Sequence, residues 1–351
     1  MSDPLVVVSV GAHTPLGLNS QASCYVYRAH QAAMQQSPLL DESGEPVTFC
    51  SLRTLDPYQH GTDRLCALAR PAMREAIDGL GGAAGQLRAK LFLVLDEALD
   101  PHAGAEATAA HDVLNRIFRM TGTTLNVVDA AHNTYGAAGI GAALERLTAE
   151  LTRGDVDALL LGGVHSDYEP GRIQALEAGR RLFSREQLDG LIPGEAAAFV
   201  VVMKASRARA LRLKPQVVIG ETAAARDKIR PDNDESAFEA AGLTYVVRKV
   251  GESLVASGRQ AGWLITDLSA ETFRHYELQA VSARTRKIWC EPEYLDAPAQ
   301  RMGYLGAAAM PFALVLAAEA WRGEWAPHDV AIAIGGSDFG DRVAMVMTAP
   351  S

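Results

Sequence analysis

The sequence predicts a layered α/β protein made of two similar halves. Short runs rich in Val, Ile and Leu alternate with longer helical stretches along the 351 residues. Segments of the first part recur in the second part in the same order. Two of the helical stretches consist largely of Gly and Ala, and a helix that lacks a polar face must be buried. Together these observations predict a central layer of paired helices between two sheets.

The predicted strands are short runs that are apolar on both faces, which suits a sheet covered by helices on both sides. In chain order these runs are Leu5–Val10, Leu91–Leu95, Leu125–Val128, Ala158–Leu161, Ala198–Met203, Val217–Ile219, Trp263–Thr266, Val330–Ile334 and Val343–Met347. The helical stretches between them are Arg64–Leu80, His111–Thr121, Gly136–Thr152, Ala237–Ser257 and Ala307–Trp321.

An internal repeat supports the two halves. Residues 135–144 (YGAAGIGAAL) and 304–314 (YLGAAAMPFAL) each lead a helix that is followed by a strand ending in Gly-Gly. The offset is 170 residues from Gly136 to Gly306 and 173 from Gly162 to Gly335. Composition alone could make two Gly/Ala helices look alike, but the Gly-Gly strands repeat in the same order. We therefore expect one half over 1–205 and the other over 206–351.

The join between the halves is expected in the basic stretch at 204–214. The charged segment Asp227–Glu239 is predicted to form a surface loop.

Composition and charge exclude several function classes. Lys and Arg number 33 against 42 Asp and Glu, a net charge of −9, and no basic block is present, which argues against nucleic-acid or anionic membrane partners. The four cysteines are widely spaced without a CxxC pair, which indicates reduced thiols and no zinc site. The N-terminus lacks signal-peptide features, and the longest apolar run, Ala307–Ala318, is too short to span a bilayer. We expect a cytoplasmic protein without cofactor or metal.

Several segments resemble the β-ketoacyl synthases of the thiolase fold, in the family's order and over most of the chain. They are VVVSVGAHTPLG (6–17), DRLCALARPAMREAIDGLG (63–81), DAAHNTYGAAGIGAAL (129–144), LLLGGVHS (159–166), DGLIPGEAAAFVVV (189–202), MGYLGAAAMPFAL (302–314) and IGGSDF (334–339). The resemblance implies a thiolase-like fold, with duplicated βαβαβ halves in five α-β-α-β-α layers.

The same resemblance tests whether the family's Cys-His-His triad is present. Family members carry the acyl group on a Cys at the N-terminus of a buried helix. Alignment on Ile140 and Gly141 places Asn133 at that position, directly after His132. We interpret Asn133 as a helix N-cap whose side-chain oxygen accepts from free backbone N–H groups. His132 is either a buried imidazole or a residue lining the remnant pocket.

Both histidines of the triad are also missing. The strand at 263–266 is followed by ITDLSAETFRHYE without a His-Gly-Thr triplet, and we place His275 on the next helix. The second His position is occupied by Tyr304, and the Lys that precedes it in the family falls near Ala299. With Asn133 and Tyr304 at degenerate positions, we expect no residue that catalyses condensation.

Other polar residues offer weaker candidate sites. We interpret His60 as part of a helix start, and Glu195 as resembling a family carboxylate that holds turns together. The three carboxylates after the strand at 91–95 either perform acid/base chemistry or bind a cation, or they lie in a solvated loop, which we favour. We expect His165 and Asp167, which follow the Gly-Gly pair of the strand at 158–161, to lie in a loop that faces solvent. The alternative is that these two residues line a pocket. The three carboxylates are Asp96, Glu97 and Asp100.

The cysteines do not fall at the nucleophile position, and we expect each to be a small core residue. They are Cys24, Cys50, Cys66 and Cys290.

Two functions remain open. The first is a catalytically degenerate ketosynthase-like protein that acts as a scaffold or adaptor, as a homodimer or heterodimer joined through the edge strand around Leu125–Asp129. By resemblance, its partner is an active ketosynthase, a carrier protein or an effector of type VI secretion. The alternative is an acyl-thioester enzyme with non-covalent chemistry such as decarboxylation, in which Asn133, Tyr304 and His132 stabilise an oxyanion.

Overall fold

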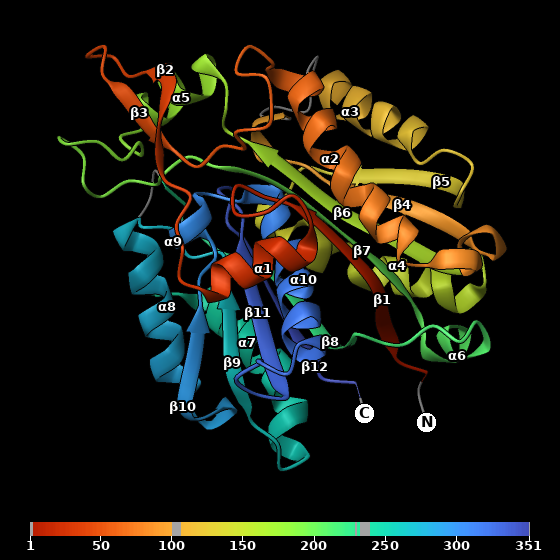
Figure 1. The fold of residues 1–351 in the computed structure, drawn as a ribbon. Helices are drawn as coiled ribbons and strands as arrows, with labels where there is room; N and C mark the ends of the chain where they lie inside the picture. Colours follow the sequence, from red (N-terminus) through yellow and green to blue (C-terminus); the bar gives the residue numbers. More distant parts are fainter. Residues whose placement is uncertain (1–2, 100–106, 229, 232–238, 351) are drawn as a thin grey trace.

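The computed structural model describes residues 3–99, 107–228, 230–231 and 239–350. Strands and helices alternate along the chain (Figure 1). The strands are β1 (Leu5–His13), β2 (Gln35–Leu40), β3 (Pro46–Phe49), β4 (Arg88–Val94), β5 (Asn126–Asn133), β6 (Ala158–Ser166), β7 (Glu195–Lys204), β8 (Val217–Arg226), β9 (Ala261–Thr266), β10 (Trp289–Asp296), β11 (Val330–Gly336) and β12 (Asp341–Thr348). The α-helices are α1 (Ser20–Arg28), α2 (Gly61–Asp78), α3 (Ala107–Met120), α4 (Gly139–Arg153), α5 (Pro170–Ala178), α6 (Ala205–Ala210), α7 (Ala241–Ala256), α8 (Thr272–Arg284), α9 (Ala299–Met302) and α10 (Ala309–Arg322).

Each predicted strand and helix corresponds to an element of the structure, with shifted ends. The sequence did not predict β2, β3 or β10, nor the helices α1, α5, α6 and α9. The segment predicted as a loop, Asp227–Glu239, lies largely outside the described residues. None of the described helices is both long and apolar enough to cross a membrane.

The duplication is visible in the sheet. Its ten strands have the order β10-β9-β11-β12-β8-β1-β7-β6-β4-β5. Read outward from the middle, β1-β7-β6-β4-β5 and β8-β12-β11-β9-β10 show the same sequence of two antiparallel and then two parallel pairings. The half-sheets meet through the short antiparallel pairing of Leu5–Val7 with Val217–Ile219. This confirms the internal repeat, while the division at residue 205 stays a prediction.

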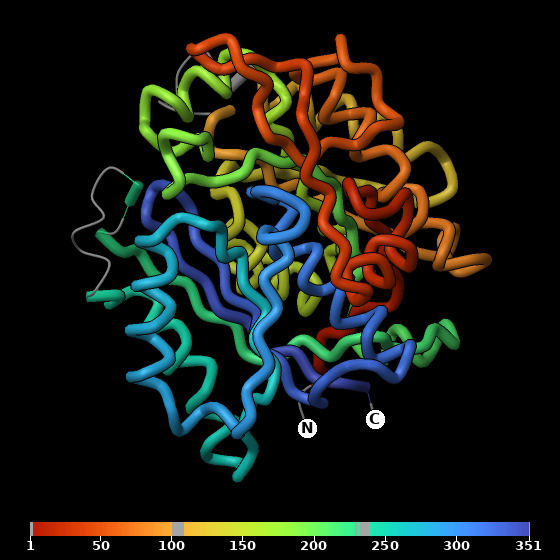
Figure 2. The backbone as a smooth tube through the Cα atoms, turned by 60° about the vertical axis from the view of Figure 1, so that its left-hand side comes forward, coloured from red at the N-terminus to blue at the C-terminus, as the bar shows by residue number. Residues whose placement is uncertain are grey.

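The elements form five layers, as predicted. Helices α4 and α10 lie between the half-sheets, α2 and α3 cover the outer face of the first, and α7 and α8 cover the outer face of the second (Figure 1). The central cluster of apolar side chains includes residues from both half-sheets. The start of β1 and the end of β12 lie at the same end of the molecule, on either side of β8 (Figure 2).

Small residues allow the central helices to approach the sheet closely. On β6, a Cβ atom added to Gly163 would lie 2.0 Å from the carbonyl oxygen of Ala307, just before α10. Gly163 therefore fixes where α10 begins against the sheet.

Candidate functional site

The candidate site lies where the N-termini of α4 and α10 face one another in the central layer. Each helix follows a 3₁₀ turn, Gly136–Ala138 before α4 and Gly306–Ala308 before α10, and the two turns are in contact. Each turn starts with a glycine at positive φ, +48° for Gly136 and +42° for Gly306. Helix N-termini favour negative groups, so the chemistry of this place depends on what lies in front of them.

Asn133 is the last residue of β5 and not a helix cap. Its side-chain Nδ2 donates to the carbonyl oxygen of Gly139 at 2.9 Å, and among the described residues its Oδ1 has no hydrogen-bond partner. The residue before α4 is Ala138, which provides no side-chain cap. The N-cap prediction was therefore wrong, because the 3₁₀ turn separates β5 from α4. The Asn133 amide donates to a backbone carbonyl group and does not accept from backbone N–H groups.

His132 lies on the other face of β5. It is paired in register with Leu93, whose side chain belongs to the outer apolar cluster below α2 and α3. Its half-buried ring lies 6.2 Å from the ring of His111 on α3. The pocket-lining interpretation of His132 does not hold, because alternation along a strand turns it away from the central layer that Asn133 faces. The ring is packed as the other interpretation expected, although it is half-buried and not fully buried.

Tyr304 is buried, with 3% of its surface exposed. Its ring packs edge-on against the His165 imidazole at 5.1 Å, and its hydroxyl group has no hydrogen-bond partner in the described part of the chain. Burial, together with the nearby carboxyl groups of Asp338 and Glu97, raises the pKa of Tyr304 well above its ordinary value. Tyr304 is thus a neutral phenol at neutral pH.

His165 lies between two carboxylates. Its Nδ1 is 2.8 Å from Asp96 Oδ2 and its Nε2 is 3.1 Å from Asp167 Oδ2. Both contacts are ion pairs whose angles do not meet hydrogen-bond geometry. Burial alone would lower the pKa of His165, but the charges of Asp167 and Asp96 outweigh it and raise the pKa to about 10. Arg172 Nε adds a contact of 2.8 Å to Asp167 Oδ1. His165 is therefore an imidazolium at neutral pH.

Glu97 occupies the space in front of α4. A Cβ atom on Gly136 would lie 2.4 Å from both carboxyl oxygens of Glu97, so the carboxyl group rests against the bare Cα. Oε1 accepts the backbone N–H of Asp338 at 3.0 Å. Burial and the charges of Asp96 and Asp338 raise the pKa of Glu97 to about 8. At neutral pH Glu97 is mostly an uncharged acid.

Arg181 joins this region to the second half of the molecule. Its Nε lies 2.7 Å from Glu271 Oε1, and its Nη1 lies 2.6 Å from Asp338 Oδ2. Arg274 approaches the same Asp338 carboxylate at 3.6 Å. These groups complete a set that we call the ionic cluster, consisting of Asp96, Glu97, His165, Asp167, Arg172, Arg181, Glu271, Arg274 and Asp338.

The prediction that the polar residues at the carboxyl ends of β4 and β6 face solvent was wrong. Asp96 is 8% exposed, Glu97 4%, His165 1% and Asp167 0%, whereas Asp100 lies outside the described residues. A signal was present in the sequence, because polar residues follow two parallel strands that pair side by side, and their carboxyl ends meet at one edge. The remaining members come from helices α5 and α8 and from the loops that hold Arg181, Glu271 and Asp338, and they carry no such signal.

Glu195 and His60 have structural positions. Arg64 donates to both carboxylate oxygens of Glu195, at 2.6 and 2.8 Å, and the backbone N–H of Leu52 donates to the same carboxylate. This agrees with its predicted role of holding turns together. His60 precedes α2, and its Nδ1 lies 3.0 Å from the carbonyl oxygen of Tyr168.

No cysteine is in the ionic cluster. Cys24, Cys50 and Cys66 are buried and Cys290 is half-buried. Among the described residues, no group of three or more His, Cys, Asp or Glu side chains is placed to hold a metal ion. A small cavity of about 10 Å³ borders the cluster near Asp267, Arg274 and Arg342, and this volume is room for about one water molecule.

The buried acid gives a pH prediction for Glu97→Gln. The folded protein holds the Glu97 proton up to about pH 8, whereas an ordinary Glu has a pKa of 4.5, so this group contributes stability below pH 4.5 that is lost as the pH rises to 8. Gln resembles the protonated acid and does not titrate. We expect the free energy of unfolding of the variant, relative to wild type, to rise by roughly 2–4 kcal/mol between pH 5 and 8.5.

Urea unfolding followed by circular dichroism at several pH values measures this difference. Other titrating groups, including His165, are common to both proteins and cancel. Stability curves that stay parallel across the range would show that Glu97 is ionised in the folded protein.

The fold of this chain is similar to that of several solved structures of ketosynthases. A chain of the AntDE:AntF complex, a type II polyketide synthase acyl-carrier protein with its ketosynthase, superposes with a TM-score of 0.80 at 12% identity, with both chains covered fully. The ishigamide ketosynthase/chain length factor gives 0.76 at 14% identity, again over both full chains. The oxazolomycin ketosynthase domain from Streptomyces albus gives 0.74 at 14% identity, over 99% of this chain and 75% of that one.

The chain thus has the fold of thiolase-like ketosynthases. No protein-family model matches the sequence, and no curated protein matches it.

Proposed function

We propose that this chain is a catalytically degenerate ketosynthase-like protein that acts by binding other proteins. The observation that carries the proposal is the ionic cluster, whose mutually paired side chains occupy the space in front of α4 and α10. The resemblance places the nucleophile at Asn133, and a carboxamide cannot carry an acyl group as a thioester. Tyr304 stands in place of a histidine, with its phenol held neutral.

The protonation states of the cluster support the same conclusion. His165 already carries its proton at neutral pH and cannot accept another. A general base needs a pKa near the working pH, and the pKa of Glu97, at about 8, lies in that range. Glu97 therefore also supports the second candidate function, an acyl-thioester enzyme with non-covalent chemistry such as decarboxylation, with Glu97 exchanging the proton.

Intact-protein mass spectrometry after exposure to acyl- and malonyl-thioesters, on coenzyme A and on a carrier protein, distinguishes the two functions. We expect neither a covalent adduct nor thioester turnover. Turnover that is lost in Glu97→Gln and in Asn133→Ala would instead establish the enzyme. A covalent adduct of one acyl group per chain would contradict the proposal that the chain is catalytically degenerate.

The Tyr304 hydroxyl group gives a second test. Because it has no hydrogen-bond partner in the described residues, Tyr304→Phe is expected to leave the free energy of unfolding unchanged or to raise it by about 1 kcal/mol. The matched control is Tyr27→Phe, which removes a 2.8 Å hydrogen bond to Asp296 and should cost about 1–3 kcal/mol. Urea unfolding measures both. An equal loss in the two variants would show that a bound molecule satisfies the Tyr304 hydroxyl group.

The binding role implies a partner. Strand β5 is the edge of the first half-sheet, and Val128 on it is 45% exposed. By resemblance, this edge joins two ketosynthase-like chains, so we propose a homodimer or a heterodimer with an active ketosynthase. A carrier protein or a type VI secretion effector is the further partner. Two of the similar structures contain such assemblies, a ketosynthase with its acyl-carrier protein and a ketosynthase/chain length factor.

A further inference from the structure

The outward side of α1 carries a stripe of apolar side chains. Ala22 and Tyr25 lie three residues apart on one side of α1, Ala29 is its C-cap residue, and Leu18 lies two residues before the helix begins. We call these four residues the α1 stripe. Leu18 and Tyr25 are 56% and 41% exposed. The other side of α1 packs on β1 and α10 through Ser20, Ser23, Cys24 and Tyr27.

Leu18 has no local reason to be apolar. It precedes the N-cap residue Asn19, a position from which a hydrophobic side chain often packs on the fourth helical residue. That residue is Ser23, which is buried and bonded to backbone carbonyl groups of the preceding turn. The exposure of Leu18 is therefore not explained by capping of its own helix.

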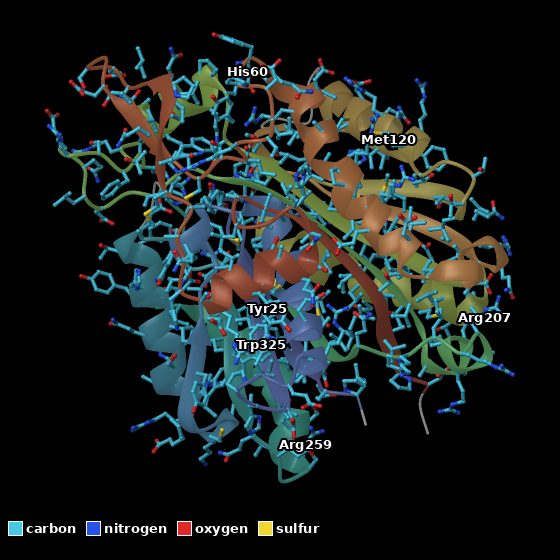
Figure 3. The ribbon with its side chains drawn as sticks, in the orientation of Figure 1. Tyr25, His60, Met120, Arg207, Arg259 and Trp325 are labelled. Atoms are coloured by element: carbon cyan, nitrogen blue, oxygen red, sulfur yellow. The ribbon has the colours of Figure 1, made fainter. Side chains whose placement is uncertain are left out.

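An aromatic and cationic pair extends the α1 stripe. The Trp325 ring, just after α10, lies 6.4 Å from the Tyr25 ring, and the Arg28 guanidinium lies 5.2 Å from the centre of the Trp325 ring. Tyr25 and Trp325 lie next to one another on one face of the molecule (Figure 3). Trp, Tyr and Arg are the residue types that contribute most binding energy at protein interfaces.

The α1 segment itself carries no carboxylate, although three contact its inner side: Glu75 and Glu319 accept from Ser20, and Asp296 accepts from Tyr27. Residues 4–40 contain no Asp or Glu, although the chain has 42 of them. Arg28 and Arg301 belong to no ion pair within the described residues, and Arg301 lies over the Tyr27 ring at 5.2 Å. Arg322 is paired with Glu319, and the exposed carboxylate beside Trp325 is Glu324. Two guanidinium groups that belong to no ion pair among the described residues therefore border the α1 stripe, and that of Arg301 also contacts His30 Nδ1 at 2.5 Å.

We propose that the α1 stripe docks an acidic amphipathic helix of a different protein. Helix α1 has nine residues and is therefore about 14 Å long, which gives a second helix a ridge of about two and a half turns to pack against. Carboxylates beside the apolar face of that helix would pair with Arg28 and Arg301. A second copy of this chain fits less well, because its own α1 stripe offers Arg28 and Arg301 no carboxylate, residues 4–40 containing no Asp or Glu. The inference rests on the proposed binding role and concerns a surface separate from β5.

The probe for the test is a fluorescein-labelled peptide of roughly 18 residues, long enough to form a helix. Leu recurs in it at three- and four-residue spacing, and Glu and Ala fill the other positions. The matched peptide has Lys for every Glu. Fluorescence anisotropy with the full chain should show the acidic peptide binding at least tenfold more tightly than the basic one, with affinity that falls as salt is raised.

The variants locate the binding surface. Arg28→Glu and Tyr25→Ser should each weaken the acidic peptide at least tenfold, with thermal unfolding unchanged. Tyr245→Ser is the control, since Tyr245 on α7 is 57% exposed and remote in sequence from the α1 stripe, and it should bind as wild type does. Equal binding of both peptides, no binding of either, or wild-type affinity in Tyr25→Ser would overturn the proposal.

Analytical ultracentrifugation tests whether the chain self-associates through the α1 stripe. Self-association that Tyr25→Ser abolishes would show that a second copy occupies the α1 stripe, against the proposal. None of these results depends on thioester chemistry, so a failure here leaves the mass-spectrometric test of the binding role untouched.

Discussion

Gly163→Ala is expected to lower the free energy of unfolding by about 3 kcal/mol or more, because the added methyl group has no space. Its Cβ would lie 2.0 Å from the carbonyl oxygen of Ala307 and 2.9 Å from Cγ of Pro311. Ala307 lies in the 3₁₀ turn just before α10 and Pro311 lies in the first turn of that helix, which is buried between the half-sheets and cannot move outward. Urea unfolding followed by circular dichroism measures the loss.

Gly171→Ala is the matched control for that substitution. Gly171 lies in α5, and nothing is within 4 Å of its added Cβ. Ala favours the helical conformation over Gly by about 0.5–1 kcal/mol, so this variant should be slightly more stable than wild type. Equal stability of Gly163→Ala and wild type would contradict the close approach of α10 to β6.

Arg64→Ala should cost about 3–5 kcal/mol, because it leaves a buried carboxylate without its counterion. Glu195 is 0% exposed, and the two bonds from Arg64, at 2.6 and 2.8 Å, face its carboxylate. The same guanidinium stacks over the Tyr168 ring at 3.8 Å and donates to the carbonyl oxygens of Asp56 and Gln59. The midpoint of urea unfolding should fall accordingly.

A surface ion pair provides the comparison. Arg153 and Asp155 approach to 2.7 Å, but their side chains are 60% and 51% exposed, so Arg153→Ala should change stability by less than about 1 kcal/mol. The double variant Arg64→Ala/Glu195→Ala should recover part of the loss, because it removes the lone charge as well. A loss in Arg64→Ala no larger than in Arg153→Ala would show that Glu195 is not an isolated buried charge.

The interior strands were predictable from sequence because burial on both faces leaves a continuous apolar run, as in β4, β6, β7 and β11. The edge strands were not. β10 reads WCEPEYLD, contains a proline, and is mostly exposed, so its pairing with β9 decides its conformation. β5 was predicted only over its first residues, and its polar end, Asp129–Asn133, is extended because it continues to pair with β4.

The sequence located the candidate site but did not predict its contacts. The positions of Asn133 and Tyr304 followed from motifs local in sequence, and so did the absence of a cysteine there. The ionic cluster depends on tertiary contacts, such as Arg181 with Asp338, which are 157 residues apart. A charged residue near the end of a strand is predicted to be solvent-exposed unless its ion-pair partner is known. For this reason the sequence did not predict the burial of four residues, Asp96, Glu97, His165 and Asp167.

The shared central layer has a consequence for how the chain reaches its folded state. Helix α10 packs on β1, β6 and β7, so the sheet of the first half is completed by a helix that is synthesised after most of the second half. Contacts such as that between Gly163 and Ala307 close a loop of 144 residues, from 163 to 307. Such non-local closure slows folding, and it leaves the inner face of the first sheet open to chaperones or to aggregation until residue 322 has left the ribosome.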